Sequence, residues 1–214
     1  MPSRPRVVIA DDHTLVAELC KRLLESEYDV VGIVGDGRAL VQAAEELKPD
    51  VIVVDIAMPV LNGFDAGLRV KERFPAVKVL YLTMNSDPEL AAEALCRGCS
   101  GYLLKTCAVS ELVTAVRTVL RGKTYLSRTI RRDEVDYFRW QDTGQAGVEK
   151  LLTSRQREVL QLLAEGKVMK EIGDILNMKA RTVAFHKYRM METLGAKNSA
   201  DLIKYAVKKH MVAA

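Results

Sequence analysis

Residues 51–63 read Val-Ile-Val-Val-Asp-Ile-Ala-Met-Pro-Val-Leu-Asn-Gly, and this stretch decides the fold. Its first four residues are all β-branched, which is typical of a strand buried on both faces of a sheet. Asp55 follows this apolar run, and Gly63 begins a segment with apolar residues at three- and four-residue spacing. The stretch therefore predicts one strand, a polar turn and one helix.

The same strand–turn–helix unit occurs five times in the first part of the chain. The expected strands are 6–10, 29–34, 51–54, 77–82 and 101–104, and the expected helices are 14–26, 38–47, 63–74, 88–97 and 109–121. This alternation predicts an α/β doubly wound (βα)5, flavodoxin-like domain, with helices on both faces of a parallel sheet. Ligands of such sheets bind at the carboxyl ends of the strands.

Charge and composition change along the chain, which predicts two domains and a linker. Residues 1–122 hold 14 Lys or Arg and 17 Asp or Glu. Residues 123–149 are mostly charged, polar or small, and we interpret them as an interdomain linker with a helical turn near 133–140. The last domain is expected at 150–214. Its residues 151–214 hold 12 Lys or Arg against 6 Asp or Glu, so this part is expected to meet a polyanion.

The last domain is expected to be all-α, with four short helices. Their predicted ranges are 154–165, 169–176, 181–194 and 199–209. Gly166 and Gly195 stand just after the first and third of these helices, where glycine commonly ends a helix. A tight turn between the second and third helices suits a helix-turn-helix unit.

The bulk properties argue against a membrane protein. The chain has 214 residues, of which 49% are hydrophobic and 28% charged, as is ordinary for globular proteins. No apolar run approaches the roughly 18 residues that span a bilayer. Residues 1–6 lead straight into a strand without the apolar core of a signal peptide. We therefore expect a cytoplasmic protein.

Four cysteines stand at 20, 96, 99 and 107. Cys96 and Cys99 form a CxxC, a spacing found in redox pairs and in zinc sites. No histidine lies near this pair in the sequence. We therefore expect all four cysteines to be small buried residues.

Four of the expected strands end next to a residue suited to phosphoryl chemistry. The first is followed by Asp11 and Asp12, the third by Asp55, the fourth by Thr83 and the fifth by Lys105. Three converging carboxylates offer the oxygen ligands that Mg²⁺ prefers. Asp55 could then act as a nucleophile toward a phosphoryl group, while the metal ion and the Lys105 ammonium neutralise the developing charge.

The same residues resemble the signature of receiver domains. The resemblance covers residues 5–122. It is carried by Ile9-Ala10-Asp11-Asp12-His13, Asp55-Ile56-Ala57-Met58-Pro59 with Gly63, Leu82-Thr83-Met84, and Gly101-Tyr102-Leu103-Leu104-Lys105. Each element is common by itself, but all of them occur in order and at strand ends.

The receiver resemblance implies a role for each of these residues. Asp55 would be the phosphoacceptor. The implied Mg²⁺ ligands are Asp12, Asp55 and the backbone carbonyl of Ala57, with Asp11 acting through water. Thr83 would hydrogen-bond a phosphoryl oxygen and Lys105 would pair with the phosphoryl group. Tyr102 would move inward behind Thr83, so that the new charge repacks the adjacent face.

The end of the chain resembles LuxR-type helix-turn-helix domains over residues 150–214. The resemblance is carried by Leu152-Thr153-Ser154-Arg155-Gln156-Arg157-Glu158-Val159-Leu160, Lys170-Glu171-Ile172, Thr182-Val183, His186 and Leu194-Gly195. Together the two halves resemble the NarL/FixJ class of two-component response regulators. This class implies a sensor histidine kinase and a twofold site on double-stranded DNA as partners. It also implies a homodimer in the active state, paired through the last helix.

The helix near 180–194 would enter the major groove with its N-terminus first. The residues expected near DNA are Lys170, Arg181, Thr182, Ala184, Phe185, Lys187 and Tyr188. The basic side chains among them are candidates for phosphate contacts. Ala184, Phe185 and Tyr188 match positions where the family tends to read base edges. Because these three are apolar or phenolic, contacts to thymine methyl groups are expected rather than bidentate recognition of guanine.

A few positions depart from the family patterns. Val168-Met169 and Lys179 stand where relatives usually have small polar residues that cap a helix, and neither valine nor lysine can accept the backbone hydrogen bond. Ala184 replaces a residue that is commonly basic, and Val109 replaces a common proline. These changes bear on operator affinity and on one loop rather than on the fold.

The leading hypothesis is a transcription factor switched by phosphorylation. It is not an enzyme of the usual kind, although the receiver would catalyse its own phosphoryl transfer and autodephosphorylation. Three alternatives remain open at this point. They are an aspartate-dependent phosphatase or phosphotransferase, a protein-interaction module whose DNA-binding half has degenerated, and a regulator coupled directly to a light or redox sensor.

Overall fold

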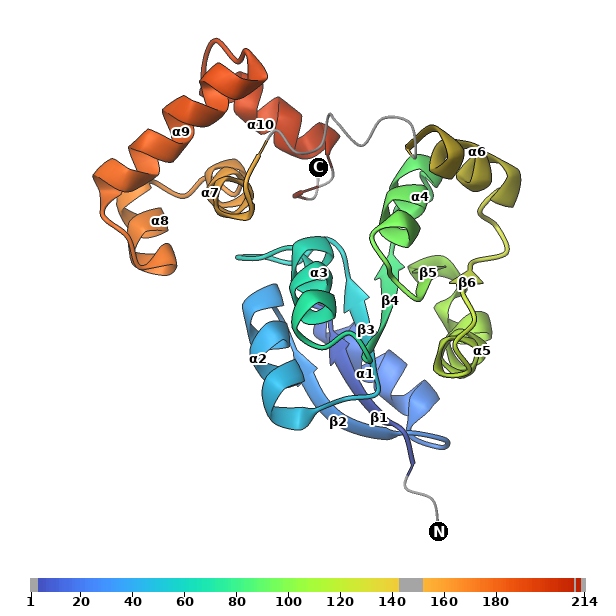
Figure 1. The fold of residues 1–214 in the computed structure, drawn as a ribbon. Coiled ribbons are helices and arrows are strands. Elements are labelled where there is room, and N and C mark those ends of the chain that lie inside the picture. Colours follow the sequence, from blue (N-terminus) through green and yellow to red (C-terminus); the bar gives the residue numbers. More distant parts are fainter. Residues whose placement is uncertain (1–3, 143–151, 210, 213–214) are drawn as a thin grey trace. The chain divides into compact units, whose positions relative to one another are not determined.

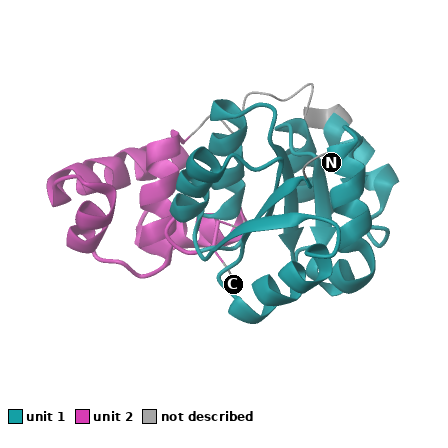
Figure 2. Cartoon of the chain, turned by 90° about the horizontal axis from the view of Figure 1, so that it is seen from below, with its two compact units in different colours: residues 1–58, 62–145 teal, residues 59–61, 146–214 magenta. Residues whose placement is uncertain are grey.

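The computed structural model describes residues 4–142, 152–209 and 211–212, and its ribbon is drawn in Figure 1. The chain divides into two compact units, coloured separately in Figure 2. The first unit comprises residues 1–58 and 62–145, and the second comprises residues 59–61 and 146–214.

The first unit contains a six-stranded parallel sheet in the order β2-β1-β3-β4-β5-β6. The strands are β1 (Arg6–Ala10), β2 (Asp29–Val34), β3 (Val51–Asp55), β4 (Lys78–Thr83), β5 (Gly101–Leu104) and β6 (Tyr125–Leu126). The helices are α1 (Thr14–Leu24), α2 (Gly37–Leu47), α3 (Gly63–Arg73), α4 (Pro88–Cys96) and α5 (Ala108–Leu120), with a short 3-10 helix η1 (Lys105–Cys107) before α5. The expected doubly wound α/β fold is confirmed.

Helices cover both faces of this sheet. On one face, α1 and α5 share a core with alternate residues of the central strands, including Val7, Ile9 and Leu103. On the other face, α3 lies so close to β4 that the Tyr81 hydroxyl donates to the carbonyl of Phe64 over 3.0 Å. Both faces of β1 and β3 are therefore buried, as their unbroken apolar sequence predicted.

Gly63 sets how closely α3 approaches the end of β3. A Cβ atom at this position would lie 1.7 Å from the backbone carbonyl oxygen of Asp55. No side chain fits there without moving the backbone. The glycine that opens α3 thus holds the helix directly against the strand end that carries Asp55.

The chain after α5 adds a sixth strand and a helix to the first unit. β6 pairs in parallel with β5, and α6 (Arg132–Asp142) packs against α4. Ile130 and Val135 of this segment are buried. The sequence predicted only a helical turn near 133–140 and did not anticipate β6, because two residues are too few to form a recognisable pattern.

The second unit is a bundle of four helices around one small core. The helices are α7 (Ser154–Ala164), α8 (Met169–Leu176), α9 (Ala180–Leu194) and α10 (Ser199–Lys208). Its most deeply buried side chains include Val159, Leu160, Ile172, Val183, Met190 and Leu202. Thr153 and Gln156 form a reciprocal capping box at the start of α7.

The turn between α8 and α9 is held by a close backbone approach. Asn177 ends α8 in the left-handed conformation, with φ of 51°. The Met178 N–H then donates to the carbonyl of Gly173 over 2.8 Å. A Cβ atom on Gly173 would lie 2.6 Å from the Met178 carbonyl oxygen. The tight turn expected between these helices is therefore present and depends on a glycine.

The cysteines only partly follow the prediction. Cys20 is buried, and Cys99 and Cys107 are half-buried. The expectation that all four are buried is wrong for Cys96, which is exposed at the end of α4, where the helix meets solvent. None of the helices in the described part of the chain combines the length and apolar character needed to cross a membrane.

Candidate functional site

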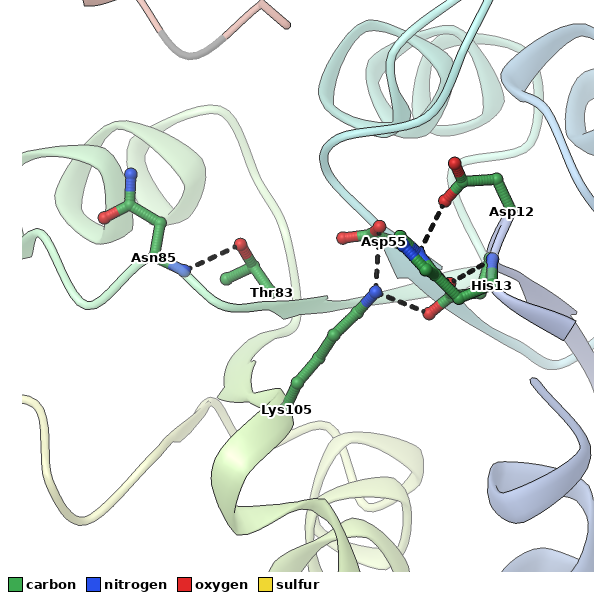
Figure 3. Close-up of polar contacts among 7 residues, drawn as sticks. Asp12, His13, Asp55, Thr83, Asn85 and Lys105 are labelled. Carbon is green, nitrogen blue, oxygen red and sulfur yellow. Dashed lines mark hydrogen bonds and ion pairs between the residues drawn. The ribbon is translucent and has the colours of Figure 1, made fainter. Parts of the chain in front are cut away.

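The acidic residues meet at the carboxyl edge of the sheet because their strands are neighbours. Asp11 and Asp12 follow β1, and Asp55 is the last residue of β3, which pairs directly with β1. Lys105 follows β5 at the start of η1 and reaches back across the edge toward both strands (Figure 3). The parallel topology thus brings together residues that are up to 94 positions apart.

Lys105 joins two buried carboxylates. Its Nζ lies 2.8 Å from Asp11 Oδ2 and 2.9 Å from Asp55 Oδ2. The side chain of Lys105 is 10% exposed, that of Asp11 is 1% exposed and that of Asp55 is 4% exposed. Ion pairs shielded from water to this degree are much less screened than surface pairs. The lysine therefore balances one of the two negative charges of Asp11 and Asp55.

The electrostatics of Asp55 reflect two opposing effects. Burial raises the pKa of Asp55, while the hydrogen bond and positive charge of Lys105 and a backbone hydrogen bond from Ala57 lower it. The net direction is upward. For Lys105, burial alone would lower the pKa, but the hydrogen bonds and charges of Asp11 and Asp55 outweigh it and raise the pKa. Lys105 is therefore charged at neutral pH.

Four residues at this edge offer ligand atoms for a metal ion. One ligand atom from each of Asp11, Asp12, His13 and Asp55 lies within 4.8 Å of the others. The carboxylate oxygens among them are hard ligands of the kind that Mg²⁺ and Ca²⁺ take. Ala57, whose carbonyl was expected to complete the set, follows two residues after Asp55. The donor set therefore fits a divalent cation.

His13 was part of the motif but was not assigned a role from the sequence. Its Nδ1 lies 3.0 Å from Asp12 Oδ1 and 3.4 Å from Asp11 Oδ1. Its backbone N–H donates to Asp11 Oδ1 over 2.9 Å, which fixes the turn after β1. The imidazole is 67% exposed, so it is open to solvent while it contacts the acidic pair.

A second polar group lies at the ends of β4 and β5. Thr83 is the buried last residue of β4, and its Oγ1 accepts the Asn85 N–H over 3.1 Å. Tyr102 is fully buried, and its hydroxyl donates to the Asn85 carbonyl over 2.9 Å. Burial raises the pKa of Tyr102, and a hydrogen bond with Thr83 opposes this effect. Asn85, which the sequence did not single out, thus connects the two residues.

The second unit presents a continuous exposed stripe on α9. Arg181, Phe185 and Tyr188 are exposed and stand four and three residues apart, so they lie along one side of the helix. Phe185 is 61% exposed and Tyr188 is 64% exposed. Val183 and Met190 are fully buried and attach the opposite side of α9 to the core.

The other residues expected near DNA lie beside this stripe or on α8. Thr182, Ala184 and Lys187 are half-buried on α9, and Lys170 is exposed on α8.

Neither Val168 before α8 nor Lys179 before α9 makes a side-chain capping hydrogen bond, as their side-chain chemistry predicted. At α8 the Glu171 carboxylate accepts the Val168 N–H over 2.8 Å.

Comparison with known proteins decides the family. The model of the response regulator receiver domain matches residues 7–117, which is more than half of the chain. This chain belongs to the response-regulator family. A second model, for bacterial regulatory proteins of the luxR family, matches residues 150–206. The response regulator therefore has the NarL/FixJ-type arrangement that the sequence predicted, a receiver followed by a LuxR-type DNA-binding domain.

Relatives of this response regulator match it over nearly their whole length. The oxygen regulatory protein NreC of Staphylococcus aureus is 36% identical over 97% of this chain and 99% of its own. RcsB from Salmonella enterica serovar Typhimurium, solved on promoter rprA with the phosphomimetic BeF3⁻, is 28% identical with a TM-score of 0.60, covering 95% of this chain and 98% of its own. A LuxR-family response regulator from Aurantimonas sp. SI85-9A1 is 31% identical with a TM-score of 0.60, covering 64% and 99%. The protein is thus a two-component transcription regulator.

Proposed function

We propose that Asp55 accepts a phosphoryl group from a sensor histidine kinase, and that this modification controls dimerisation and DNA binding. The observation that carries the proposal is the bridge from Lys105 to Asp11 and Asp55. A buried carboxylate whose cationic neighbour is shared with a second carboxylate can take up an anionic group, because the cation can pair with that group instead. The same arrangement would be costly if its only role were structural.

The phosphoryl transfer would proceed by direct attack. A carboxylate oxygen of Asp55 attacks the phosphorus of a phosphohistidine, the P–O bond forms as the P–N bond breaks, and the histidine leaves and takes up a proton. Lys105 neutralises charge on the transferring group. Hydrolysis of the acyl phosphate by water would later return Asp55 to its resting form.

Mg²⁺ is the proposed cofactor of this reaction. Asp12, Asp55 and the Ala57 carbonyl would hold it, with Asp11 acting through water. When bound, the ion supplies positive charge that favours the approach of a phosphoryl dianion. The clustered carboxylate oxygens support this assignment, since Mg²⁺ prefers such ligands.

The switch would use Thr83 and Tyr102. Thr83 Oγ1 accepts the Asn85 N–H over 3.1 Å, and the Thr83 O–H would donate to a phosphoryl oxygen on Asp55. Rotation of the hydroxyl toward that oxygen would lengthen its hydrogen bond with Asn85. Because Tyr102 hydrogen-bonds the carbonyl of the same Asn85, a change at Thr83 is passed to Tyr102 and the start of α4. In this way a charge added to Asp55 would alter the surface of the domain.

The output would be binding to a twofold site on double-stranded DNA in the cytoplasm. Arg181, Lys187 and Lys170 would contact phosphates, while Thr182, Ala184, Phe185 and Tyr188 would face the major groove. The α10 helix, with Ile203 and Val207 at four-residue spacing and both exposed, would pair two chains. As part of the proposal, residues 1–122 act as the receiver and residues 150–214 as the DNA-binding domain, with residues 123–149 between them. Within residues 123–149, β6 and α6 pack on the first unit.

The test measures DNA affinity and molar mass in the same samples, with and without beryllofluoride and Mg²⁺. Wild type should dimerise and bind DNA more tightly with the mimic, and Asp55→Asn should do neither. Asp136→Asn is a matched control, because Asp136 is exposed on α6 and far in sequence from the site. DNA binding that is equal with and without the mimic would refute the switch. Absence of DNA binding at both low and physiological salt would favour a protein-interaction module.

A further inference from the structure

We infer that Ser127, held by Glu111, positions the end of β5, which carries Tyr102 and directly precedes Lys105, and thereby sets the rate of phosphoryl transfer to Asp55. The inference rests on the proposed function of Asp55. It assigns a role in the chemistry to residues that follow the receiver motif and that no sequence pattern connected with it.

Ser127 contacts β5 at two backbone positions. Its N–H donates to the Tyr102 carbonyl over 2.9 Å, which continues the ladder between β5 and β6. Its side-chain Oγ accepts the Leu104 N–H over 3.3 Å. Since β6 ends at Leu126, the hydroxyl takes the place of the backbone carbonyl that a longer strand would offer. Ser127 therefore completes the edge of β5 up to the residue before Lys105.

Glu111 fixes the orientation of this hydroxyl. Glu111 lies in the first turn of α5 and is only 7% exposed. Its Oε2 accepts the Ser127 hydroxyl over 2.9 Å and the Tyr125 hydroxyl over 2.8 Å. A buried carboxylate is costly unless its oxygens receive hydrogen bonds. Losing Ser127 would thus leave both Glu111 and the Leu104 N–H with one partner fewer.

The hydrogen bonds of Ser127 reach β5 next to both polar groups of the site, the one around Lys105 and the one around Tyr102. Leu104 is followed by Lys105, which pairs with Asp11 and Asp55. Tyr102 hydrogen-bonds Asn85 at the end of β4. A displacement of the β5 terminus would therefore move both the ammonium group and the tyrosine. Ser127 itself contacts none of the carboxylates of the site, so its role is that of a positioning residue.

The experiment measures phosphorylation of the full-length chain by phosphoramidate, and Mg²⁺ binding by calorimetry. Ser127→Ala should be phosphorylated about three- to ten-fold more slowly, the effect of one hydrogen bond of ordinary strength. Its Mg²⁺ affinity should stay within two-fold of wild type, because the ligands come from β1 and β3. Ser110→Ala is the matched control. Ser110 is an exposed serine whose hydroxyl donates only to the Cys107 carbonyl in the same region.

Glu111→Gln keeps the volume of the side chain and weakens both hydroxyl contacts, so it should slow phosphorylation in the same direction. If Ser127→Ala does not fold, the phosphorylation rate of Glu111→Gln tests the inference. Wild-type rates in the folded variants would overturn the inference and leave the proposed function intact. A parallel loss of rate and of Mg²⁺ affinity would also overturn it, because the effect would then be general destabilisation. If wild type itself is not phosphorylated, the result refutes the proposed function rather than the role of Ser127 alone.

Discussion

Replacing Lys105 with methionine removes the cation of the acidic site while keeping a flexible chain of similar length. Its Nζ lies within 2.9 Å of both Asp11 and Asp55, and the three side chains are 10%, 1% and 4% exposed. Removing one partner of a buried ion pair typically costs about 3–5 kcal/mol, because the remaining charge is buried without compensation. We therefore expect the free energy of unfolding of the first unit to fall by about 3 kcal/mol at pH 7 without Mg²⁺.

The direction of the pKa shift of Asp55 predicts how this loss of stability changes with pH. Burial already raises the pKa of Asp55 above its ordinary value of 3.8, against the effect of Lys105. The stability that Asp55 contributes is therefore fully present below the unfolded pKa and is lost as the pH rises through the folded pKa. Without Lys105 the folded pKa rises further, and the penalty at neutral pH grows. The difference between variant and wild type should thus shrink as the pH falls toward 3.8.

Hydrogen exchange of the sheet amides at increasing urea concentration measures the first unit separately from the second. Lys123→Met removes an exposed lysine and should change the stability by less than about 0.5 kcal/mol. Mg²⁺ should restore part of the stability of Lys105→Met, because it brings positive charge to the same carboxylates. The reasoning is refuted if Lys105→Met costs no more than Lys123→Met, or if its cost is the same at pH 7 and near pH 4.

Three further predictions concern the second unit. Gly173→Ala places a Cβ atom 2.6 Å from the Met178 carbonyl oxygen and should lower the free energy of unfolding by about 1–3 kcal/mol in urea titration. Lys179→Ser supplies the missing cap of α9 and should raise the same free energy by about 1 kcal/mol; an unchanged melting temperature would contradict this. Phe185→Ala removes a side chain that is 61% exposed. It should leave stability nearly unchanged and weaken binding to a selected DNA site. Replacing thymine with uracil in that site should lower the affinity of wild type, and Phe185→Ala should abolish this difference, measured by fluorescence anisotropy.

Much of the first unit could be predicted because its signals are local. The strands are short runs of Val, Ile and Leu, and the parallel order places each following polar residue at one edge of the sheet. Asp11, Asp55 and Lys105 could therefore be brought together from the sequence alone. The same holds for α9, where apolar Val183 and Met190 stand seven residues apart.

The missed features depend on contacts between distant residues. Glu111 looks like an ordinary acidic residue in the first turn of a helix, yet it is buried and accepts the hydroxyls of Tyr125 and Ser127. Ser127 follows a strand of two residues, which is too short to show periodicity. Cys96 was expected to be buried because free cysteines usually are, but it stands on the outward side of α4. In each case, the tertiary environment decides what the local sequence leaves open.

The balance of charge at the site explains why one lysine is shared between two aspartates. Asp11, Asp12 and Asp55 carry three negative charges against the single positive charge of Lys105, so the site has a deficit that matches one divalent cation. A phosphoryl group on Asp55 adds further negative charge beyond what that cation compensates. Lys105 can respond by giving up Asp11 for the phosphoryl oxygens, because it already reaches both carboxylates at 2.8 and 2.9 Å. The hydrogen bond from the Leu104 N–H to Ser127 holds the adjacent end of β5 in place, so that the long side chain of Lys105 makes this change of partner while its backbone stays fixed.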